Sequence, residues 1–269
     1  MRRSRSGRRC AARSCSSTAR RARASASPRA STSSPHSFPL FRPHRSPTVT
    51  STAIPFSQAL REGTWSDHSD SEGAGFMEGI MRGTATREDY VALVVQHFYM
   101  YEALEAVAAD LAQDPAVHPF LNEALIRMPA LERDLEFLVG ADWREQITAV
   151  PATEAYAARI REVGAEGWAA GFVAHHYTRY LGDLSGGQMI ARRVAKQHEF
   201  AGTGAEFYDF SSLGDLAEFK TGYRAELDAL GAGLNDDERA RAIDEVRAAY
   251  RFNTEVFIDL ARAKAAAAA

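Results

Sequence analysis

The chain has 269 residues and a formal net charge of −3, which averages two unlike parts. Residues 1–50 hold 12 arginines and no acidic residue, leaving 20 basic and 35 acidic residues, a formal charge of −15, for residues 51–269. Both cysteines lie in the first part, which excludes a disulfide, a cysteine-ligated zinc and a thiolate nucleophile from the second. No apolar run approaches the roughly 18 residues that crossing a membrane requires, so the sequence predicts no membrane anchor.

Residues 1–50 are rich in Arg, Ser, Ala and Pro, and too poor in apolar residues to offset the entropy of ordering. They therefore predict a disordered N-terminal extension. Its composition fits an organelle transit peptide, and its charge alone would fit a nucleic-acid-binding arm. We favour a third interpretation, a start codon placed too far upstream, because the folded pattern begins near Ile54 and Val49 could be a GTG start. We accordingly expect no nucleic-acid partner and a cytoplasmic protein, or an organelle protein if the segment is a genuine transit peptide.

Helical periodicity runs through the rest of the chain. Apolar residues recur at steps of three and four in four stretches, which are 91–108, 120–138, 155–163 and 213–230. Gly140 and Gly164 are the expected ends of the second and third helices. Thr86 with Asp89, and likewise Asn235 with Glu238, predict capping boxes at the first helix and at a last one that ends in alanines. Alternating strand patterns are missing and no repeat is evident, so residues 51–269 predict an all-α fold, a single compact helical bundle.

The stretch YLGDLSGGQMIARR, residues 180–193, contains the letters LSGGQ that mark nucleotide-binding loops of cassette ATPases. Such an ATPase also needs a phosphate-binding loop with a Gly-Lys pair after a strand, and this chain contains neither. Gly182, Gly186 and Gly187 each cost about 1 kcal/mol inside a helix, yet apolar sequence continues on both sides of them. Two interpretations stay open: a helix–loop–helix turn, or a kinked helix whose bare backbone lies against a flat ligand.

The longer stretch HHYTRYLGDLSGGQMIARR, residues 175–193, closely resembles the distal-helix motif of heme oxygenases. WSDHSDSEGAGFMEGIMRG, residues 65–83, resembles the proximal-helix segment of the same family. The resemblance covers about residues 54–260 and implies an all-α fold with heme sandwiched between a proximal and a kinked distal helix. It also implies that the chain opens heme to biliverdin and releases CO and ferrous iron, using O2 and electrons from an external donor. Gly182 and Gly186 would lie against the heme face.

His68 matches the position of the iron ligand in this family. Taken alone, one histidine in a short amphipathic helix is more often a surface residue, so the assignment rests on the resemblance. A neutral imidazole suits heme b iron, and the absence of cysteine from residues 51–269 excludes a thiolate ligand in its place. Glu72 lies four residues later on the same helix face and could accept the Nδ1 proton of His68, or it is an ordinary solvated glutamate.

The resemblance implies roles for further residues. Asp183 would hold an ordered water network over the iron, and Arg179 and Tyr101 would belong to the same hydrogen-bond network. Four residues would face the heme propionates, namely Arg61, Tyr177, Lys220 and Arg224. Asn253 and Phe257 would line the far wall of the pocket. The remaining histidines of the helical part match no iron-binding position and are expected in packing or surface roles; they are His97, His118, His175, His176 and His198.

Two other functions stay open, a heme-binding or heme-buffering protein without turnover and a generic helical interaction domain. Loss of Asp183 or Arg179 would have favoured the first, and both residues are present. The C-terminal LARAKAAAAA offers no hydrophobic anchor, which is typical of soluble bacterial members. The expected redox partner is either a ferredoxin with its reductase or a flavoprotein reductase.

Overall fold

The computed structural model describes residues 54–73 and 75–269, and within them every regular element is helical. The α-helices are α1 Phe56–Gly63, α2 Trp65–Glu72, α3 Gly75–Arg82, α4 Arg87–Asp110, α5 Met128–Val139, α6 Trp143–Gln146, α7 Pro151–Ala165, α8 Ala169–Gly182, α9 Gln188–Gln197, α10 Leu216–Ala232 and α11 Asp236–Ala267. A π-helical segment, Asp183–Gly187, joins α8 to α9. Short 3-10 turns span His118–Phe120, Glu123–Leu125, Glu206–Tyr208 and Ser211–Leu213. The predicted all-α fold is confirmed, whereas the predicted disorder of residues 1–50 lies outside the described residues.

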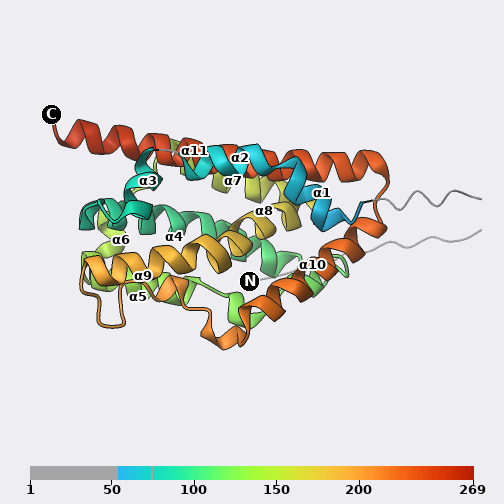
Figure 1. Cartoon of the computed structure of the whole chain (residues 1–269), viewed down its shortest axis with the longest axis horizontal. Coiled ribbons are helices and arrows are strands. Elements are labelled where there is room, and N and C mark those ends of the chain that lie inside the picture. Colours follow the sequence, from blue (N-terminus) through green and yellow to red (C-terminus); the bar gives the residue numbers. More distant parts are fainter. Residues whose placement is uncertain (1–53, 74) are drawn as a thin grey trace, which may run out of the picture. The chain divides into compact units, whose positions relative to one another are not determined.

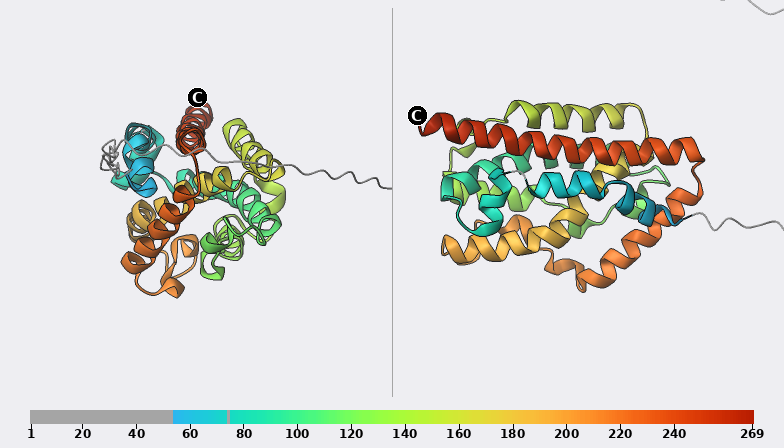
Figure 2. Two further views of the ribbon diagram at one scale, coloured as in Figure 1. Left: turned by 90° about the vertical axis from the view of Figure 1, so that its right-hand side faces the viewer. Right: turned by 45° about the horizontal axis from the view of Figure 1, so that its top comes forward.

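The long helices α4, α7, α8 and α11 pack on one another and form the centre of the bundle. In Figure 1, α11 runs along one side with α2 beside it, and Figure 2 shows α7 alongside α11 from another direction. Large side chains fill the space between these helices, among them the fully buried Tyr101, Leu104 and Phe172. Within residues 54–73 and 75–269, no helix is long and apolar enough to cross a membrane.

Both predicted capping boxes are confirmed. The Thr86 hydroxyl accepts from the backbone N–H of Asp89 at 3.2 Å, and the Asp89 carboxylate accepts from the N–H of Thr86 at 2.8 Å. Asn235 and Glu238 repeat the exchange at 2.9 and 2.8 Å. Each pair satisfies two backbone donors that would otherwise lack partners, a contribution of about 1 kcal/mol to each helix.

The predicted helix over 120–138 begins too early. Residues before Met128 form two 3-10 turns instead, and the Asn122 side chain caps the second of them by accepting from Ala124 N–H at 2.9 Å. Pro129 lies in the first turn of α5, where its missing N–H costs nothing. Phe120 and Leu125 still face the core, so periodicity alone could not separate turns from helix. The predicted end at Gly140 is confirmed, with φ of +124°.

Gly164 does not end the third helix, because α7 continues to Ala165 and the chain reverses at Gly167 with φ of +62°. A Cβ added to Gly164 would lie 2.7 Å from Val107 Cγ1, so this glycine permits α4 and α7 to approach closely. The fourth helix starts three residues later than expected from Leu213. Its N-cap is Asp215, whose carboxylate accepts from two backbone N–H groups at 2.7 and 3.1 Å.

Candidate active site

Two adjoining cavities lie between α2, α8, the π segment and α11. The inner cavity, of about 120 Å³, is lined by residues that include Arg179, Asp183 and Asn253. The outer cavity, of about 290 Å³, is lined by residues that include Arg61, Tyr177 and Arg224. Both cavities share four lining residues, which are His68, Gly182, Gly186 and Tyr250. The shared lining makes them two parts of one cleft, with a histidine and two glycines where they meet.

His68 lies on α2 and is half-buried. Its ring stacks on Trp65, with centroids 5.8 Å apart, and meets the edge of Tyr250 on α11 at 5.5 Å. Packing of α2 against α11 holds the helix at the cleft. Glu72 occupies the last turn of the same helix, but its side chain lies outside the described part of the structure, so its predicted contact with His68 stays a prediction.

The helix on the other side of the cleft is continuous from α8 through the π segment into α9. This geometry confirms the kinked helix over the helix–loop–helix turn, and a single widened π turn is a known cause of such a kink. A Cβ added to Gly182 would meet nothing within 4 Å, so it would project into the cleft. Gly187 differs, because its Cβ would lie 2.9 Å from the ring of Tyr208. Gly182 therefore presents bare backbone to the cleft, and Gly186 lines both cavities beside it, while Gly187 packs against protein.

Asp183 begins the π segment and is buried beside the glycines. The Tyr101 hydroxyl donates a short hydrogen bond to its carboxylate. Burial raises the pKa of Asp183, although Arg179 and Tyr101 partly counteract this effect. Burial also raises the pKa of Tyr101 well above its ordinary value, so the phenol keeps its proton. The predicted contact between Tyr101 and Asp183 is present.

Arg179 lies one turn before Asp183 and is also buried. Its guanidinium donates to Asn253 Oδ1 and to His97 Nδ1, both at 2.9 Å, and its Cζ lies 5.3 Å from the centre of the Tyr101 ring. Burial alone would lower the pKa of Arg179, but Tyr101 and Asp183 raise it above its ordinary value. Among the described residues, the buried Nε of Arg179 has no hydrogen-bond partner. A permanent positive charge thus borders the inner cavity, while this Nε is buried within the protein.

His97 and Tyr208 are among the lining residues of the inner cavity that the sequence analysis missed. His97 lines the cavity and joins Arg179 to the hydroxyl of Tyr208, which lies 3.2 Å from His97 Nε2. His97 stands four residues before Tyr101 on α4, and this helical spacing was a usable signal. Tyr208 lies in a 3-10 turn far along the chain from the glycine motif, where no sequence pattern marks it.

The other histidines fit the expected packing or surface roles. His175 is buried against Glu245, and His176 is buried with its Nδ1 2.8 Å from the hydroxyl of Tyr223. His118 is exposed at the surface.

The outer cavity brings together three of the four residues predicted to face propionates. Arg61 and Arg224 line it from α1 and α10, and both are exposed. Tyr177 lies between them; burial raises the pKa of its phenol, and Arg224 and Arg61 counteract the effect. Lys220 is not among the lining residues, since its Nζ donates to the carbonyl of Leu184 at 3.2 Å. This end of the cleft is positively charged and suits carboxylates.

Asn253 and Phe257 both line the inner cavity from α11, as expected. Within the part of the chain that the structure describes, no three His, Cys, Asp or Glu side chains gather as a metal site. A single histidine on one side of a flat cleft suits iron whose other ligands come from a macrocycle. The bare backbone opposite His68 and the cationic rim fit heme with its two carboxylates.

Comparison with known proteins identifies relatives along nearly all of the helical part. The heme oxygenase family model matches residues 54–259. Heme oxygenase 1 from a Nostoc species is 39% identical over 202 residues, covering 75% of this chain and 84% of that protein. Human heme oxygenase 1 is 35% identical over 207 residues, covering 76% and 71%.

Solved structures of heme oxygenases are also similar to this chain. The crystal structure of heme oxygenase-1 from a Synechocystis species in complex with heme superimposes with a TM-score of 0.73 at 32% identity, covering 80% of this chain and 98% of that one. Heme oxygenase-2 from the same organism, in complex with heme and NO, gives 0.75 at 32% identity, covering 80% and 88%.

Proposed function

The chain belongs to the heme oxygenase family and cleaves heme oxidatively, and we propose that it does so with His68 as the ligand of the heme iron. The observation that carries the proposal is the placement of His68 across one cleft from Gly182 and Gly186. A side chain at Gly182 would project into the space that the ring needs. Glycine is the residue that lets backbone approach a flat ligand this closely.

Bound heme supplies an iron that binds O2 and a porphyrin edge that is oxidised. The chain's own residues bind and orient this substrate. Arg61 and Arg224 pair with the propionates at the outer end of the cleft, and Tyr177 adds a hydroxyl between them. Charge pairing at one end fixes which edge of the ring lies beneath Asp183 in the inner cavity.

Asp183 holds water in the inner cavity. One of its oxygens accepts from Tyr101, which leaves the other to accept from a water beside the substrate. Arg179 also lines this cavity and places a positive charge beside it. Together these groups deliver a proton to the substrate at the Asp183 end of the inner cavity. The apolar side chains around them exclude bulk water.

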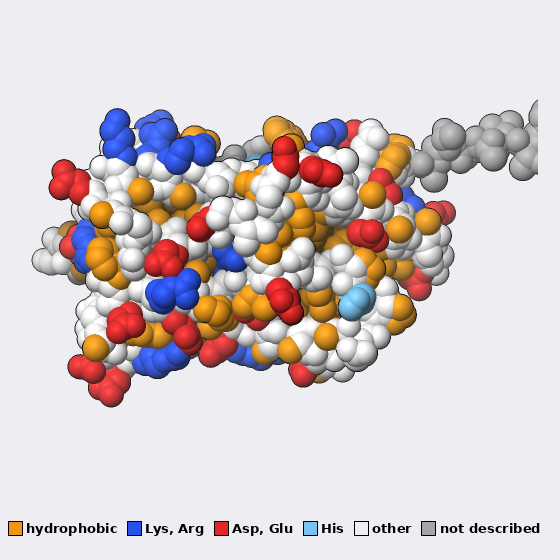
Figure 3. Space-filling model, turned by 90° about the horizontal axis from the view of Figure 1, so that it is seen from below, with side chains coloured by type: hydrophobic (Ala, Val, Ile, Leu, Met, Phe, Trp, Pro, Cys, Tyr) orange, Lys and Arg blue, Asp and Glu red, His pale blue; other side chains and the backbone are white. Residues whose placement is uncertain are grey.

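The reaction needs O2 and electrons from outside the chain, and we propose a ferredoxin with its reductase or a flavoprotein reductase as donor. Acidic and basic side chains are interspersed on the face shown in Figure 3, so the overall charge does not select between these partners. Docking depends on local patches. A cytoplasmic location stays a prediction, with an organelle as the alternative if residues 1–50 are a transit peptide.

His68→Ala tests the assignment of the iron ligand. The full chain is titrated with hemin, and absorption spectra are recorded before and after ascorbate is added under air. We expect the wild type to develop a Soret band that gives way to bilin, whereas His68→Ala shows a changed Soret band and no bilin until imidazole is added. His118→Ala, which removes an exposed histidine, serves as the control. Wild-type spectra and bilin yield from His68→Ala would overturn the proposal.

The second candidate is a heme-binding protein without turnover. A stable Soret band in the wild type after reduction, with no bilin and no CO, would favour it.

A further inference from the structure

Two polar side chains of the inner cavity have no role in the assignment above. His97 and Tyr208 are 5% and 2% exposed, yet both line the cavity that His68 and Asp183 also line. Polar groups buried this deeply are costly unless they form hydrogen bonds. Their presence in the wall of this cavity calls for an account of where those bonds go.

The directions of the hydrogen bonds follow from the chemistry of the donors. A guanidinium only donates, so His97 Nδ1 accepts from Arg179 at 2.9 Å. Burial and the nearby charge of Arg179 lower the pKa of His97 well below its ordinary value, so the ring is neutral. Its one proton is therefore on Nε2 and is donated to the Tyr208 hydroxyl at 3.2 Å.

The phenol of Tyr208 thus accepts on the side of His97, and its own proton points elsewhere. Burial and the nearby Asp183 raise the pKa of Tyr208 well above its ordinary value, so this proton stays on the oxygen. Tyr208 lines the inner cavity. The chain Arg179–His97–Tyr208 therefore ends in a phenol that lines the substrate space and has a proton left to donate.

The position of Tyr208 is fixed from several sides. Its carbonyl accepts from Gln188 Nε2 at 2.8 Å, which ties the turn to the start of α9, and Gln188 Nε2 also donates to the carbonyl of Asp183 at 3.2 Å. Arg127 donates to the carbonyls of the two residues that flank it, at 3.3 and 2.6 Å. Asp134 accepts from three backbone N–H groups of residues 204–207, at 2.8 to 3.0 Å. A turn held this way fixes the backbone at Tyr208, and His97 acts on the phenol oxygen and so on the direction of its proton.

We propose that Tyr208 is a second hydrogen-bond donor to the small ligand bound between His68 and Asp183, and that His97 is the positioning residue that aims it. The proposal rests on the proposed function, in which His68 holds the heme iron. Such a donor favours ligands that accept hydrogen bonds, as O2 does, over CO, which accepts poorly. It therefore helps the enzyme bind its oxidant in the presence of a product that competes for the same iron.

Tyr208→Phe tests the donor with two probe ligands, azide, which accepts hydrogen bonds, and CO. The full chain loaded with hemin is titrated with azide in the ferric state and with CO in the ferrous state. We expect Tyr208→Phe to weaken azide about 3- to 10-fold, the range for one lost hydrogen bond, and to leave CO affinity within about twofold.

The matched control is Tyr223→Phe, which removes a buried hydroxyl that is also bonded to a histidine, His176, but lines neither cavity. It should change neither affinity. Unchanged azide affinity in Tyr208→Phe, or an equal loss for azide and CO, would overturn the proposal.

The role of His97 is tested independently of heme. Nitrogen-15 NMR of the heme-free chain should show His97 protonated on Nε2 only, and a proton on Nδ1 would contradict the proposed direction of the chain of bonds. Because this readout needs no iron ligand, it stands even if the assignment of His68 fails. In the loaded chain, His97→Leu should weaken azide as Tyr208→Phe does, and the double variant should lose little more than either single variant. Fully additive losses would overturn the coupling.

Discussion

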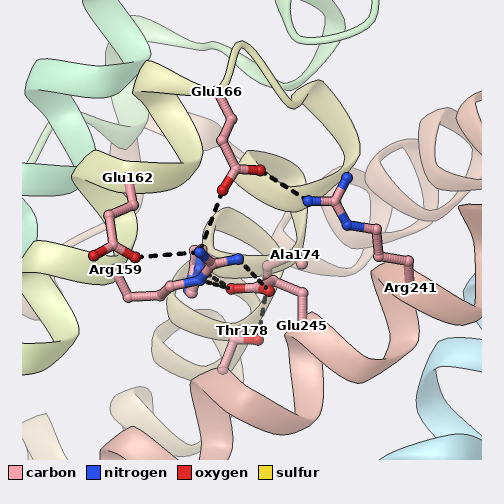
Figure 4. Close-up of polar contacts among 8 residues, drawn as sticks. Arg159, Glu162, Glu166, Ala174, Thr178, Arg241 and Glu245 are labelled. Carbon is pink, nitrogen blue, oxygen red and sulfur yellow. Dashed lines mark hydrogen bonds and ion pairs between the residues drawn. The ribbon is translucent and has the colours of Figure 1, made fainter.

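Two buried polar clusters begin on neighbouring turns of α8. They differ in whether their charged side chains are paired with opposite charges or bonded to neutral groups. In the first, His175 Nε2 lies 2.9 Å from Glu245, and Arg159 donates two hydrogen bonds to the same carboxylate at 2.8 and 2.9 Å. Figure 4 shows how Arg159 also reaches Glu162 and Glu166 at the surface. Burial would raise the pKa of Glu245, but His175 and Arg159 lower it to about 2. Every charge in this Glu245 cluster meets an opposite charge supplied by the chain.

In the second, the Asp183 cluster, Arg179 donates to the neutral groups of His97 and Asn253, and Asp183 accepts from the neutral phenol of Tyr101. Burial raises the pKa of Asp183 rather than lowering it. The comparison teaches that the Glu245 cluster uses its charges to join α7, α8 and α11, whereas the Asp183 cluster keeps charge available to the cleft. Variants of the first should change stability, and variants of the second should change turnover.

Among the variants that leave Asp183 in place, Arg179→Leu should give the largest effect. It removes the cation of the inner cavity, and the loss of such a preorganised group typically slows a reaction about 100-fold. Bilin formation is followed by absorbance after hemin-loaded protein is reduced under air. Arg241→Leu, which removes an exposed arginine linked to Glu166 at the edge of the Glu245 cluster, should retain the wild-type rate. Equal rates for Arg179→Leu and Arg241→Leu would erase the distinction between the clusters.

Glu245→Gln should lower the free energy of unfolding by about 2–3 kcal/mol, because it leaves Arg159 and the buried His175 without their carboxylate. Urea unfolding monitored by circular dichroism measures the change, and bilin formation per folded molecule should stay at the wild-type value. Glu162→Gln alters only an exposed partner of Arg159 and should cost less than about 0.5 kcal/mol. A large loss of turnover in Glu245→Gln at full heme occupancy would break the comparison.

Tyr101→Phe tests the comparison of the two clusters with a smaller change. It removes one hydrogen bond to Asp183 and leaves the ring in place, so bilin formation should slow about 3- to 10-fold. Tyr90→Phe removes a buried hydroxyl that donates to the carbonyl of Gly204, outside the lining of both cavities, and is the control. We expect it to affect stability alone, and a similar slowing in both variants would contradict a special role for the Tyr101 hydroxyl.

The contributions of the Glu245 and Asp183 carboxylates to stability should also change in opposite directions with pH. Since the pKa of Glu245 is lowered from 4.5 to about 2, its stabilisation is complete above about pH 4.5 and is lost as the pH falls toward 2. Since the pKa of Asp183 is raised from 3.8, its ionised form costs stability at neutral pH, and the cost disappears at low pH. Unfolding of Glu245→Gln and Asp183→Asn across pH 2–7 should show opposite deviations from wild type that shrink in acid. Deviations of the same sign would refute this assignment.

The sequence predicted the helical class and the two capping boxes because these signals are local, and periodicity and caps act within one or two turns. The pocket residues of the glycine motif came from the resemblance to heme oxygenases, since the glycines alone also allowed a helix–loop–helix turn. The sequence could not separate the 3-10 turns of 118–125 from a helix, since both place apolar residues toward the same core. It misplaced Gly164 because a helix end and a close helix crossing require the same residue type.

Tyr208 shows most clearly what could not be predicted from the sequence. Its position depends on Arg127, Asp134 and Gln188, which lie on other elements and carry no motif. His97 was assigned to packing because its partner was unknown, although its spacing from Tyr101 was visible. Lys220 was expected at the propionates, but a side chain one turn from Arg224 has room to reach the π segment instead.

The most direct test of the account is one turnover of Asp183→Ala. The full chain is loaded with one equivalent of hemin and reduced with ascorbate under air, and heme binding, bilin and CO are measured on the same sample beside Glu245→Gln. The account predicts that Asp183→Ala binds heme within about threefold of wild type, a change under 1 kcal/mol, and yields neither bilin nor CO, while Glu245→Gln yields both. Normal bilin and CO from Asp183→Ala would show that the carboxylate beside the glycines does not serve the reaction.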